Sequence, residues 1–396
     1  MGEIHEEIER GAKWVARLWS REAILLTAIA ALVVMFAITE VVVNFYTAKQ
    51  GELAKMWFRR GDQSLLENRP KQAVEDLRNA LRYDPGNTAY QLRIAQALAA
   101  NNQIDEAEGY LLDLWNNQPG NGEVNLELAQ LQARKGSPDA ARYYDNAIYG
   151  VWPKDPEQHR WQVRLELFHY WFSHGNTAQA QAQLVALAAE TPQADYEHHT
   201  EIGNLQLQGG DPRQALQQFQ LALRVDRRYA PALAGAGAAE VAIGEYRNAI
   251  PYLQSALRLN SKNSEAAAQL QLARLVLASD PFEIGISEEE RVGRTLNAYR
   301  QAQVTLAACA SRHNVAVQAK IPQNAFQQIW AQGQQLQPLV TKLRGNPQND
   351  LRIMNFVFSA ENLAATECGP LKGKDQALWL IGKKHRLAEA SGPGGK

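Results

Sequence analysis

An alanine recurs along the middle of the chain at a nearly constant spacing, and this recurrence constrains the fold more than any other feature. Successive occurrences are 34, 33, 40, 35 and 34 residues apart, at Ala73, Ala107, Ala140, Ala180, Ala215 and Ala249. Seven residues further on, a second set recurs at the same intervals, at Ala80, Leu114, Ala147, Leu187, Ala222 and Ala256. A period near 34 residues predicts a solenoid of stacked helix pairs.

The residues around these alanines resemble the tetratricopeptide repeat family. The first unit has residues at the family's aromatic, small and helix-ending proline positions, namely Trp57, Gly61, Ala73, Ala80 and Pro85. The fifth and sixth units match at Gly203, Ala215, Phe219 and Ala222, and at Gly237, Ala249, Leu253 and Ala256. Small residues allow two antiparallel helices to approach closely, and proline cannot continue a helix. The resemblance implies an all-α superhelical solenoid of six units over residues 54–263.

One interval of 40 residues separates the third unit from the fourth. The stretch AIYGVWPKDPEQHRW lies there, and its Trp152, Pro153 and Pro156 predict a longer, stiffened loop. Such an insertion is either tolerated without further consequence or marks a bend in the solenoid or a partner contact.

Beyond the sixth unit the pattern stays helical but loses the repeat. Residues 264–312 are predicted to form an atypical seventh unit that caps the solenoid, and its second helix begins with a capping box at Ser287 and Glu290. A C-terminal helical region over 313–390 follows, with helices near 324–343, 351–366 and 376–387. Asp350 and Asp375 stand where N-caps belong. The tail, 391–396, is predicted to be disordered.

An apolar run near the amino end, residues 23–46, predicts a single transmembrane helix. Twenty helical residues cover about 30 Å, the thickness of the hydrocarbon layer. A cleaved signal peptide is the rival interpretation, but no small-x-small site follows the run cleanly. A buried core helix is disfavoured because the run is apolar on every face.

Glu40 is the one carboxylate within this run. The leucines, isoleucines, valines and the phenylalanine of residues 24–43 favour insertion by about 4–7 kcal/mol, whereas one charge at mid-membrane costs about 3 kcal/mol. The helix is therefore expected to insert. Glu40 is either a residue just inside the interface or a contact to a polar group on a neighbouring transmembrane helix.

The segment before the span, residues 1–22, is interpreted as a short amphipathic helix on the membrane surface or as a polar extension of the spanning helix. Four basic residues flank the run on each side, but Arg17 and Arg21 lie near it on the amino side, whereas only Lys49 does so on the other. The positive-inside rule then places the amino end in the cytoplasm of an inner-membrane protein and the repeats outside.

Cys309 and Cys368 are the two cysteines of the chain. In a reducing compartment they are expected to be free buried thiols. In an extracytoplasmic domain a disulfide between them is plausible and would join the capping helix to the C-terminal region.

Nothing in the sequence predicts catalysis or a cofactor. The net charge of −1 argues against a general nucleic-acid binder. No CxxC, HExxH, GxxxxGK[ST] or GxGxxG motif is present. His198 and His199 are adjacent on one helix and cannot form a paired ligand site, and His169 lies among aromatic residues, so all three are interpreted as surface or packing residues.

The family resemblance implies a groove that binds a peptide or a partner helix. In that family the fifth and ninth positions of each first helix contribute to the groove. The candidate contact residues here are Phe58, Asp62, Leu92, Gln96, Leu126, Gln130, Leu165, His169, Thr200 and Asn204. Relatives that clamp a terminal carboxylate carry Lys and Asn in their first units, where this chain has Phe58 and Asp62, so that specificity is not carried over.

These features favour a membrane-anchored scaffold for protein–protein interactions over an enzyme. The partner would be a peptide or helix in the groove, with lipid around residues 23–46 and no nucleic acid. The expected role is an accessory subunit of a bacterial membrane or envelope complex, with the repeats extracytoplasmic. The alternative is a cytoplasm-facing adaptor that regulates a membrane enzyme or protease.

Overall fold

The computed structural model describes residues 7, 11, 13–14, 21–344 and 346–391. Its regular elements in these residues are all helices, which confirms the predicted all-α class; an isolated bridge between Asn121 and Val151 is the one β pairing described. Most of the predicted amphipathic segment 1–22 and nearly all of the tail 391–396 lie outside the described residues.

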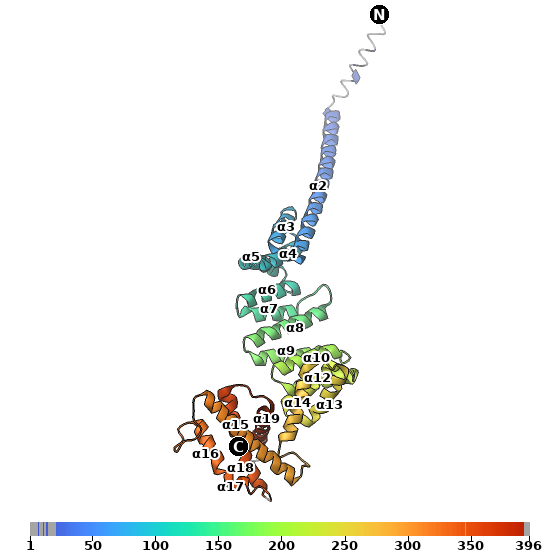
Figure 1. Ribbon diagram of the computed structural model, residues 1–396. Coiled ribbons are helices and arrows are strands. Elements are labelled where there is room, and N and C mark those ends of the chain that lie inside the picture. The colour runs from blue at the N-terminus through green and yellow to red at the C-terminus, as the bar shows by residue number, and fades with distance from the viewer. Residues whose placement is uncertain (1–6, 8–10, 12, 15–20, 345, 392–396) are drawn as a thin grey trace. The chain divides into compact units, whose positions relative to one another are not determined.

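The chain divides into two compact units, with the boundary between Tyr170 and Trp171. The helices of the first unit are α2 (Arg21–Leu66), α3 (Pro70–Tyr83), α4 (Thr88–Ala100), α5 (Ile104–Asn117), α6 (Gly122–Arg134), α7 (Asp139–Ile148) and α8 (Pro156–Ser173), which runs across the boundary. Consecutive helices pack as antiparallel pairs, α2 with α3, α4 with α5 and α6 with α7 (Figure 1).

The second unit continues the helix pairs and then departs from them. Its paired helices are α9 (Thr177–Glu190), α10 (Tyr196–Gln208), α11 (Pro212–Val225), α12 (Ala230–Ile243), α13 (Tyr246–Leu259) and α14 (Ser264–Ser279). The remaining helices are α15 (Glu288–Arg312), α16 (Ala325–Gln335), α17 (Gln337–Val340), α18 (Pro347–Cys368) and α19 (Gly373–Ser391).

The first helices of several units begin at a side-chain cap. Asn87, Asn121, Asp195 and Asn263 each accept a hydrogen bond from a backbone N–H in the first turn of the following helix. Such caps satisfy amide donors that the helix itself leaves unpaired. The recurrence of these caps fixes where each unit begins.

Large side chains of the second helices fill the space left by glycines of the first helices. Phe219 of α11 is fully buried between Gly203 of α10 and Gly235 of α12. A Cβ atom on Gly203 would lie 2.8 Å from the Phe219 ring, which is closer than real contacts allow. Leu77 faces Gly61 in the same way in the first unit. These positions are therefore closed to larger residues.

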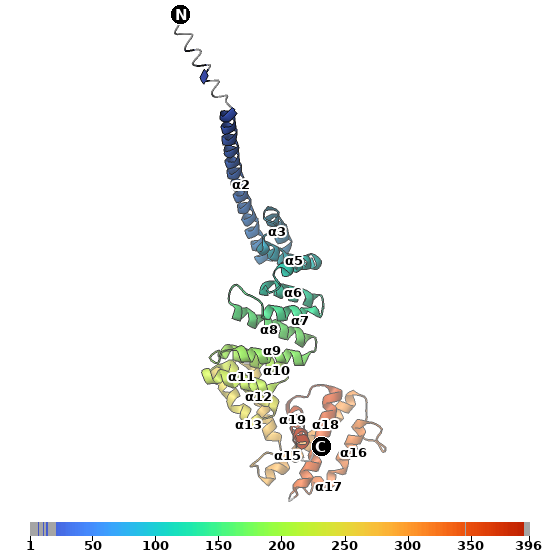
Figure 2. The same cartoon turned by 180° about the vertical axis from the view of Figure 1, so that it is seen from behind.

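The apolar run and the first repeat helix form one continuous helix, α2, of 46 residues. Figures 1 and 2 show its amino-terminal half standing clear of the other helices of its unit. It is long and apolar enough to cross a membrane, and the apolar window has no buried residue. Ala54 is the first fully buried residue along it, where α2 begins to pack against α3.

The 40-residue interval contains a packed loop. The Val151 N–H donates to the Gly120 carbonyl at 2.8 Å, and the Trp152 indole donates to the Ala147 carbonyl at 2.9 Å. Trp152 is buried over Gly122, where any side chain would collide with its ring. The insertion is therefore anchored to the third unit, while Val151 itself remains exposed.

The helices after the sixth unit share one core with the end of the solenoid. Leu253 of α13 and Leu270 of α14 belong to the same buried cluster as Leu306 of α15 and Val357 of α18. α15 packs against α16, α18 and α19, and α14 packs against α19. The apolar end of the helix stack is covered in this way.

Two predicted N-caps in the C-terminal region are wrong. α18 begins three residues earlier than Asp350, with Asn346 as its cap. Asp350 instead lies buried inside the helix, paired with Arg291 and accepting a hydrogen bond from Thr295 at 2.9 Å. α19 begins at Gly373, and Asp375 accepts bonds from Gln301 and Thr305 of α15. Both aspartates hold helices together.

The predicted helix at 324–343 is also divided in two, α16 and α17. The helix begins as expected after the cap Asn324, but it breaks at Leu336, with a proline in the first turn of α17. Proline at that position cannot donate the backbone bond that would continue α16.

Glu361 of α18 is fully buried, and neither carboxylate oxygen has a hydrogen-bond partner among the described residues. Burial raises the pKa of Glu361 to about 9, with a smaller contribution from the charge of Asp375. The folded chain therefore retains a proton on Glu361 at neutral pH that the unfolded chain releases.

Phe219→Ala is expected to lower the free energy of unfolding by about 3–5 kcal/mol, because it opens a cavity between α10 and α12. Urea unfolding followed by circular dichroism measures the change. Leu216→Ala, at a half-buried position on the same helix, is the matched control and should cost clearly less. Equal losses would contradict the packing role of Phe219.

Glu361→Met is expected to stabilise the fold at neutral pH by about 2–4 kcal/mol. The folded-state pKa of Glu361 lies above the unfolded value of 4.5, so the wild-type free energy of unfolding falls as pH rises from about 4.5 to about 9. The variant should lack this decline, and the two proteins should converge near pH 4.5. Thermal melts between pH 5 and pH 9 test the expectation, and parallel curves would contradict it.

Candidate partner-binding groove

A ladder of polar side chains connects the first helices of the first three units. Arg93 of α4 pairs with Asp62 of α2, and its Nε donates to Asp62 Oδ1 at 2.6 Å. The Arg93 guanidinium also donates to Gln96 Oε1 at 2.7 Å, and Gln96 Nε2 donates to Glu127 Oε1 of α6 at 2.8 Å. The ladder thus joins α2, α4 and α6. It contains two predicted contact residues, Asp62 and Gln96.

A further set of hydrogen bonds extends the ladder from α6 to α8. Gln130 of α6 donates from Nε2 to the carboxylate of Glu166 of α8, at 3.0 Å to Oε2, and the Tyr144 hydroxyl donates to the same oxygen at 3.4 Å. The two amides predicted from the repeat position, Gln96 and Gln130, therefore each hold a carboxylate of the next first helix. Sequence reasoning missed Arg93, Glu127 and Glu166, which lie one helical turn or less from the predicted positions.

Burial sets the protonation behaviour of this face. Desolvation raises the pKa of Glu127 above its ordinary value, and the hydrogen bond from Gln96 partly offsets that effect. Desolvation also raises the pKa of Tyr144, helped by the charge of Glu166. The face combines acidic and amide groups with the cation of Arg93.

The apolar residues among the predicted contact positions form a row beside the ladder and are partly buried. Phe58 stacks on Tyr90 with ring centroids 4.6 Å apart, and Leu92, Leu126 and Leu165 are half-buried. His169 is exposed and packs edge-on against Phe168. The row therefore presents the edges of apolar side chains beside the polar ladder.

In the second compact unit of the chain, the first helices of successive repeats form a small groove of a different character. A cavity of about 220 Å³ lies between α10, α12 and α14, with a floor of small residues that includes Ala234, Gly235 and Ala238. Asn204, Asn263 and Gln269 stand at its sides, and Glu265 is its one acidic lining residue.

Gln269 provides a buried hydrogen-bond acceptor in this groove. Its Oε1 is buried without a hydrogen-bond partner among the described residues. Asn204 is where the repeat position predicted it, whereas Gln269 of the atypical seventh unit and Asn263, the cap residue just before that unit, were missed.

One predicted groove residue is misplaced. Thr200 is buried rather than exposed on the groove surface, and its hydroxyl donates to the Tyr196 carbonyl at 2.7 Å. His199 beside it is also buried, with Nδ1 2.8 Å from Gln218 Oε1, which agrees with its interpretation as a packing residue. Here the period assigned the helix correctly but not the direction of the side chain.

Comparison with known sequences identifies repeats of one kind in two stretches of the chain. Family models described as "Tetratricopeptide repeat" match residues 64–124 and 200–264. The chain carries tetratricopeptide repeats. These repeats form a scaffold for protein interaction and are typical of non-catalytic proteins. No match was found among curated proteins.

Several solved tetratricopeptide structures resemble the chain. One is "YrrB: a TPR protein with an unusual peptide-binding site", at 16% identity and a TM-score of 0.36, covering 49% of this chain and 97% of the other. PilW, a type IV pilus biogenesis factor, has 21% identity, a TM-score of 0.37 and coverage of 55% and 96%. Pseudomonas aeruginosa pilF has 16% identity, a TM-score of 0.38 and coverage of 55% and 97%. Scores this low establish nothing about the partners of this chain.

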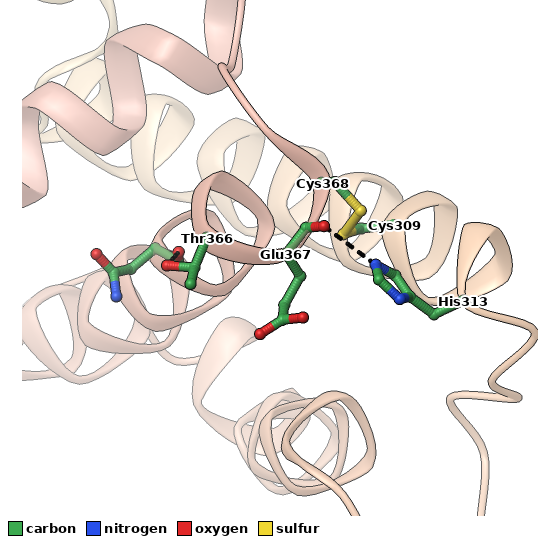
Figure 3. The surroundings of a disulfide bond; sticks show 6 residues. Cys309, His313, Thr366, Glu367 and Cys368 are labelled. Atoms are coloured by element: carbon green, nitrogen blue, oxygen red, sulfur yellow. Dashed lines mark hydrogen bonds between the residues drawn. A yellow bond between two sulfur atoms is a disulfide. The ribbon is translucent and has the colours of Figure 1, made fainter.

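Outside the repeats, a disulfide joins Cys309 of α15 to Cys368 of α18, with the Cα atoms 5.9 Å apart. Figure 3 shows the bond where the ends of the two helices meet, with His313 beside it. A ring nitrogen of His313 lies 3.1 Å from the Glu367 carbonyl. The ligand atoms of both cysteines and His313 lie within 4.8 Å of one another, but the sulfur atoms bond to each other, and metal binding requires free thiolates.

Glu40 lies on the exposed surface of α2, within the apolar half that precedes the tetratricopeptide repeats. Fourteen positions separate it from Ala54, a rise of about 21 Å along the helix. No residue of its own chain is described in contact with its carboxylate.

Removing the disulfide is expected to lower the free energy of unfolding by about 4 kcal/mol, because it closes a loop of 59 residues. The test compares urea unfolding of the Cys309→Ser/Cys368→Ser variant with that of the wild type, and the loss should be confined to the transition of the second unit. Wild-type protein treated with a reducing agent should show the same loss. An unchanged midpoint would contradict the stabilising role of the bond.

Proposed function

We propose that the chain is a single-pass membrane protein whose tetratricopeptide repeats serve as an extracytoplasmic scaffold for a bacterial membrane or envelope complex. The observation that carries this proposal is α2, a single helix that begins as an exposed apolar segment and ends as the first repeat helix. A span built into the solenoid holds the groove at a fixed distance from the lipid.

Exposure and composition support membrane insertion. The side chains of Leu25, Leu32, Val33 and Phe36 are more than 60% exposed, which is unfavourable in water for so many neighbouring residues. Lipid would cover this surface. Glu40 is proposed to meet a polar group on a partner's transmembrane helix, because an isolated carboxylate in the hydrocarbon layer is costly.

The disulfide supports the extracytoplasmic side. Disulfides form and persist in oxidising compartments and are rare in the cytosol. Two basic residues, Arg17 and Arg21, lie near the span on its amino side and only Lys49 lies near it on the other, which favours an amino end in the cytoplasm.

The two groove segments support a protein partner in an extended or helical conformation. In the first compact unit, the side chains of the polar ladder are already ordered. They offer hydrogen-bond acceptors beside the edges of apolar side chains. In the second compact unit, the floor of alanine and glycine residues leaves room for a partner's side chain. Gln269 Oε1 is an acceptor without a hydrogen-bond partner among the described residues. Exchange of water for partner donors at such sites favours binding.

A cytoplasm-facing adaptor is the second candidate, since the basic residues flanking the span are equal in number on its two sides. A cleaved signal sequence is the other interpretation of the apolar helix. Either outcome would leave the fold of the repeats intact and change only where they act.

Thiol labelling determines the side. Ser261 lies in the exposed loop between α13 and α14, so Ser261→Cys in the Cys309→Ser/Cys368→Ser background gives one accessible reporter. A membrane-impermeant maleimide should label it in intact spheroplasts as fully as after permeabilisation. Labelling that requires permeabilisation would establish the cytoplasmic alternative, and recovery of the reporter in the soluble fraction would establish cleavage.

Groove occupancy is tested by filling the small-residue floor. Ala238→Trp should reduce co-purification of cross-linked partners at least tenfold, because the indole would occupy the cavity. Ala242→Trp, exposed on the same helix and outside the cavity, is the matched control and should leave recovery unchanged. Equal recovery with both variants would exclude this groove as the binding site. Glu40→Leu tests the proposed contact in the membrane in the same assay.

A further inference from the structure

A second cavity of the second compact unit lies outside the repeat groove. It has a volume of about 430 Å³ and is formed by the carboxyl end of α14, the middle of α15 and the first turns of α19. This volume falls within the range of about 300–1,000 Å³ that is usual for small-molecule sites. Neither the repeats nor the membrane span uses it.

Three cations line this cavity, and none of its lining residues is acidic. They are Arg294 and Arg300 of α15 and Lys374 in the first turn of α19. The amino end of a helix adds a further positive potential beside Lys374. Ser279 and Asn297 supply uncharged polar groups at the same wall.

The three cations differ in what they already bind. Arg294 donates to the Leu277 and Asp280 carbonyls at 2.7 Å and 2.8 Å and pairs with Glu290, so it is held in place as part of the wall. Arg300 and Lys374 are exposed and have no ion pair or hydrogen bond among the described residues. Their charges remain available.

The acidic groups near the cavity are engaged elsewhere. Asp375 accepts hydrogen bonds from Gln301 Nε2 at 2.7 Å and from the Thr305 hydroxyl at 2.8 Å. Glu290 pairs with Arg294. Neither carboxylate lines the cavity, and neither forms an ion pair with Arg300 or Lys374.

The remaining wall is apolar apart from Gln301. Leu275 and Ala278 of α14, Ala298 and Val304 of α15 and Leu378 of α19 contribute most of it. A fully hydrated inorganic anion would leave this surface unused, and a purely apolar molecule would leave the cations unpaired. The combination fits a ligand with one anionic group attached to an apolar body.

We propose that this cavity binds a small organic anion, with its carboxylate or phosphate held by Arg300 and Lys374 and its apolar body against Leu275, Val304 and Leu378. The anion would sit over the amino end of α19. This site is independent of the partner-binding groove and of the side of the membrane on which the repeats lie.

Octanoate is a suitable probe because it joins a carboxylate to a short apolar chain. Isothermal titration of the full chain in nanodiscs of a zwitterionic phospholipid, with empty nanodiscs subtracted, should show saturable binding. Acetate lacks the apolar part and octylammonium reverses the charge, so both should bind at least tenfold more weakly.

Arg300→Glu/Lys374→Glu should weaken octanoate binding at least tenfold, because two attractive charges become repulsive. Lys342→Glu/Arg352→Glu changes the same net charge at exposed positions outside the cavity, and it should bind like the wild type. Arg300→Gln/Lys374→Gln removes the charges without repulsion and should also bind more weakly. It serves as the test if the reversed variant unfolds, which thermal melts will reveal.

Ala278→Trp tests the place of the apolar body. Ala278 is exposed on α14 and lines the cavity, so the indole should fill it and abolish saturable binding. The proposal is overturned if octanoate shows no saturation above empty nanodiscs, if octylammonium binds equally well, or if the charge-reversed or filled variant binds as tightly as the wild type.

Discussion

The close contact between a glycine or alanine on one helix and a large apolar side chain on the next is the interaction on which the solenoid depends. Phe219 illustrates it, since its ring fits only because Gly203 and Gly235 carry no Cβ atom. The contact with Gly203 closes one helix pair, and the contact with Gly235 connects that pair to the next. Because a repeat contacts mainly its neighbours, the array needs many of these contacts in sequence and a covered end. The C-terminal helices provide that cover by sharing a core with α13 and α14.

The continuity of α2 follows from the same constraint. The first repeat helix packs on α3 from Ala54 onward, while the residues before it make no contact that would require a turn. An unbroken helix between the apolar run and the repeat leaves no hinge except the half-buried glycine Gly51, which costs about 1 kcal/mol relative to alanine in a helix interior. Groove orientation and anchor orientation are consequently coupled through a single rigid element.

The sequence was sufficient to predict the repeats because the period places the same residue types at the same structural positions. It predicted the helix pairs, the capping helices 264–312 and the Ser287 cap, whose hydroxyl accepts from the Glu290 N–H as expected. Outside the period, local signals gave wrong positions. Asp350 and Asp375 look like N-caps, yet tertiary contacts to α15 bind both carboxylates inside their helices. Local propensity cannot reveal partners that lie more than fifty residues away in sequence.

The groove shows the same limit at the level of side chains. Repeat position predicted Gln96 and Gln130 but not the carboxylates they bind, because Glu127 and Glu166 come from the following unit. In the first compact unit, a partner must offer hydrogen-bond donors that replace water around carboxylates that are already hydrogen-bonded. Burial makes the replacement of water by these donors strongly dependent on geometry. In the second compact unit the floor of the cavity consists of small, uncharged residues, so the shape of a partner's side chain matters most there. The two segments therefore make different demands on an occupant. Polar or basic side chains of a partner suit the ladder on α2, α4 and α6, whereas a compact apolar side chain suits the cavity between α10, α12 and α14.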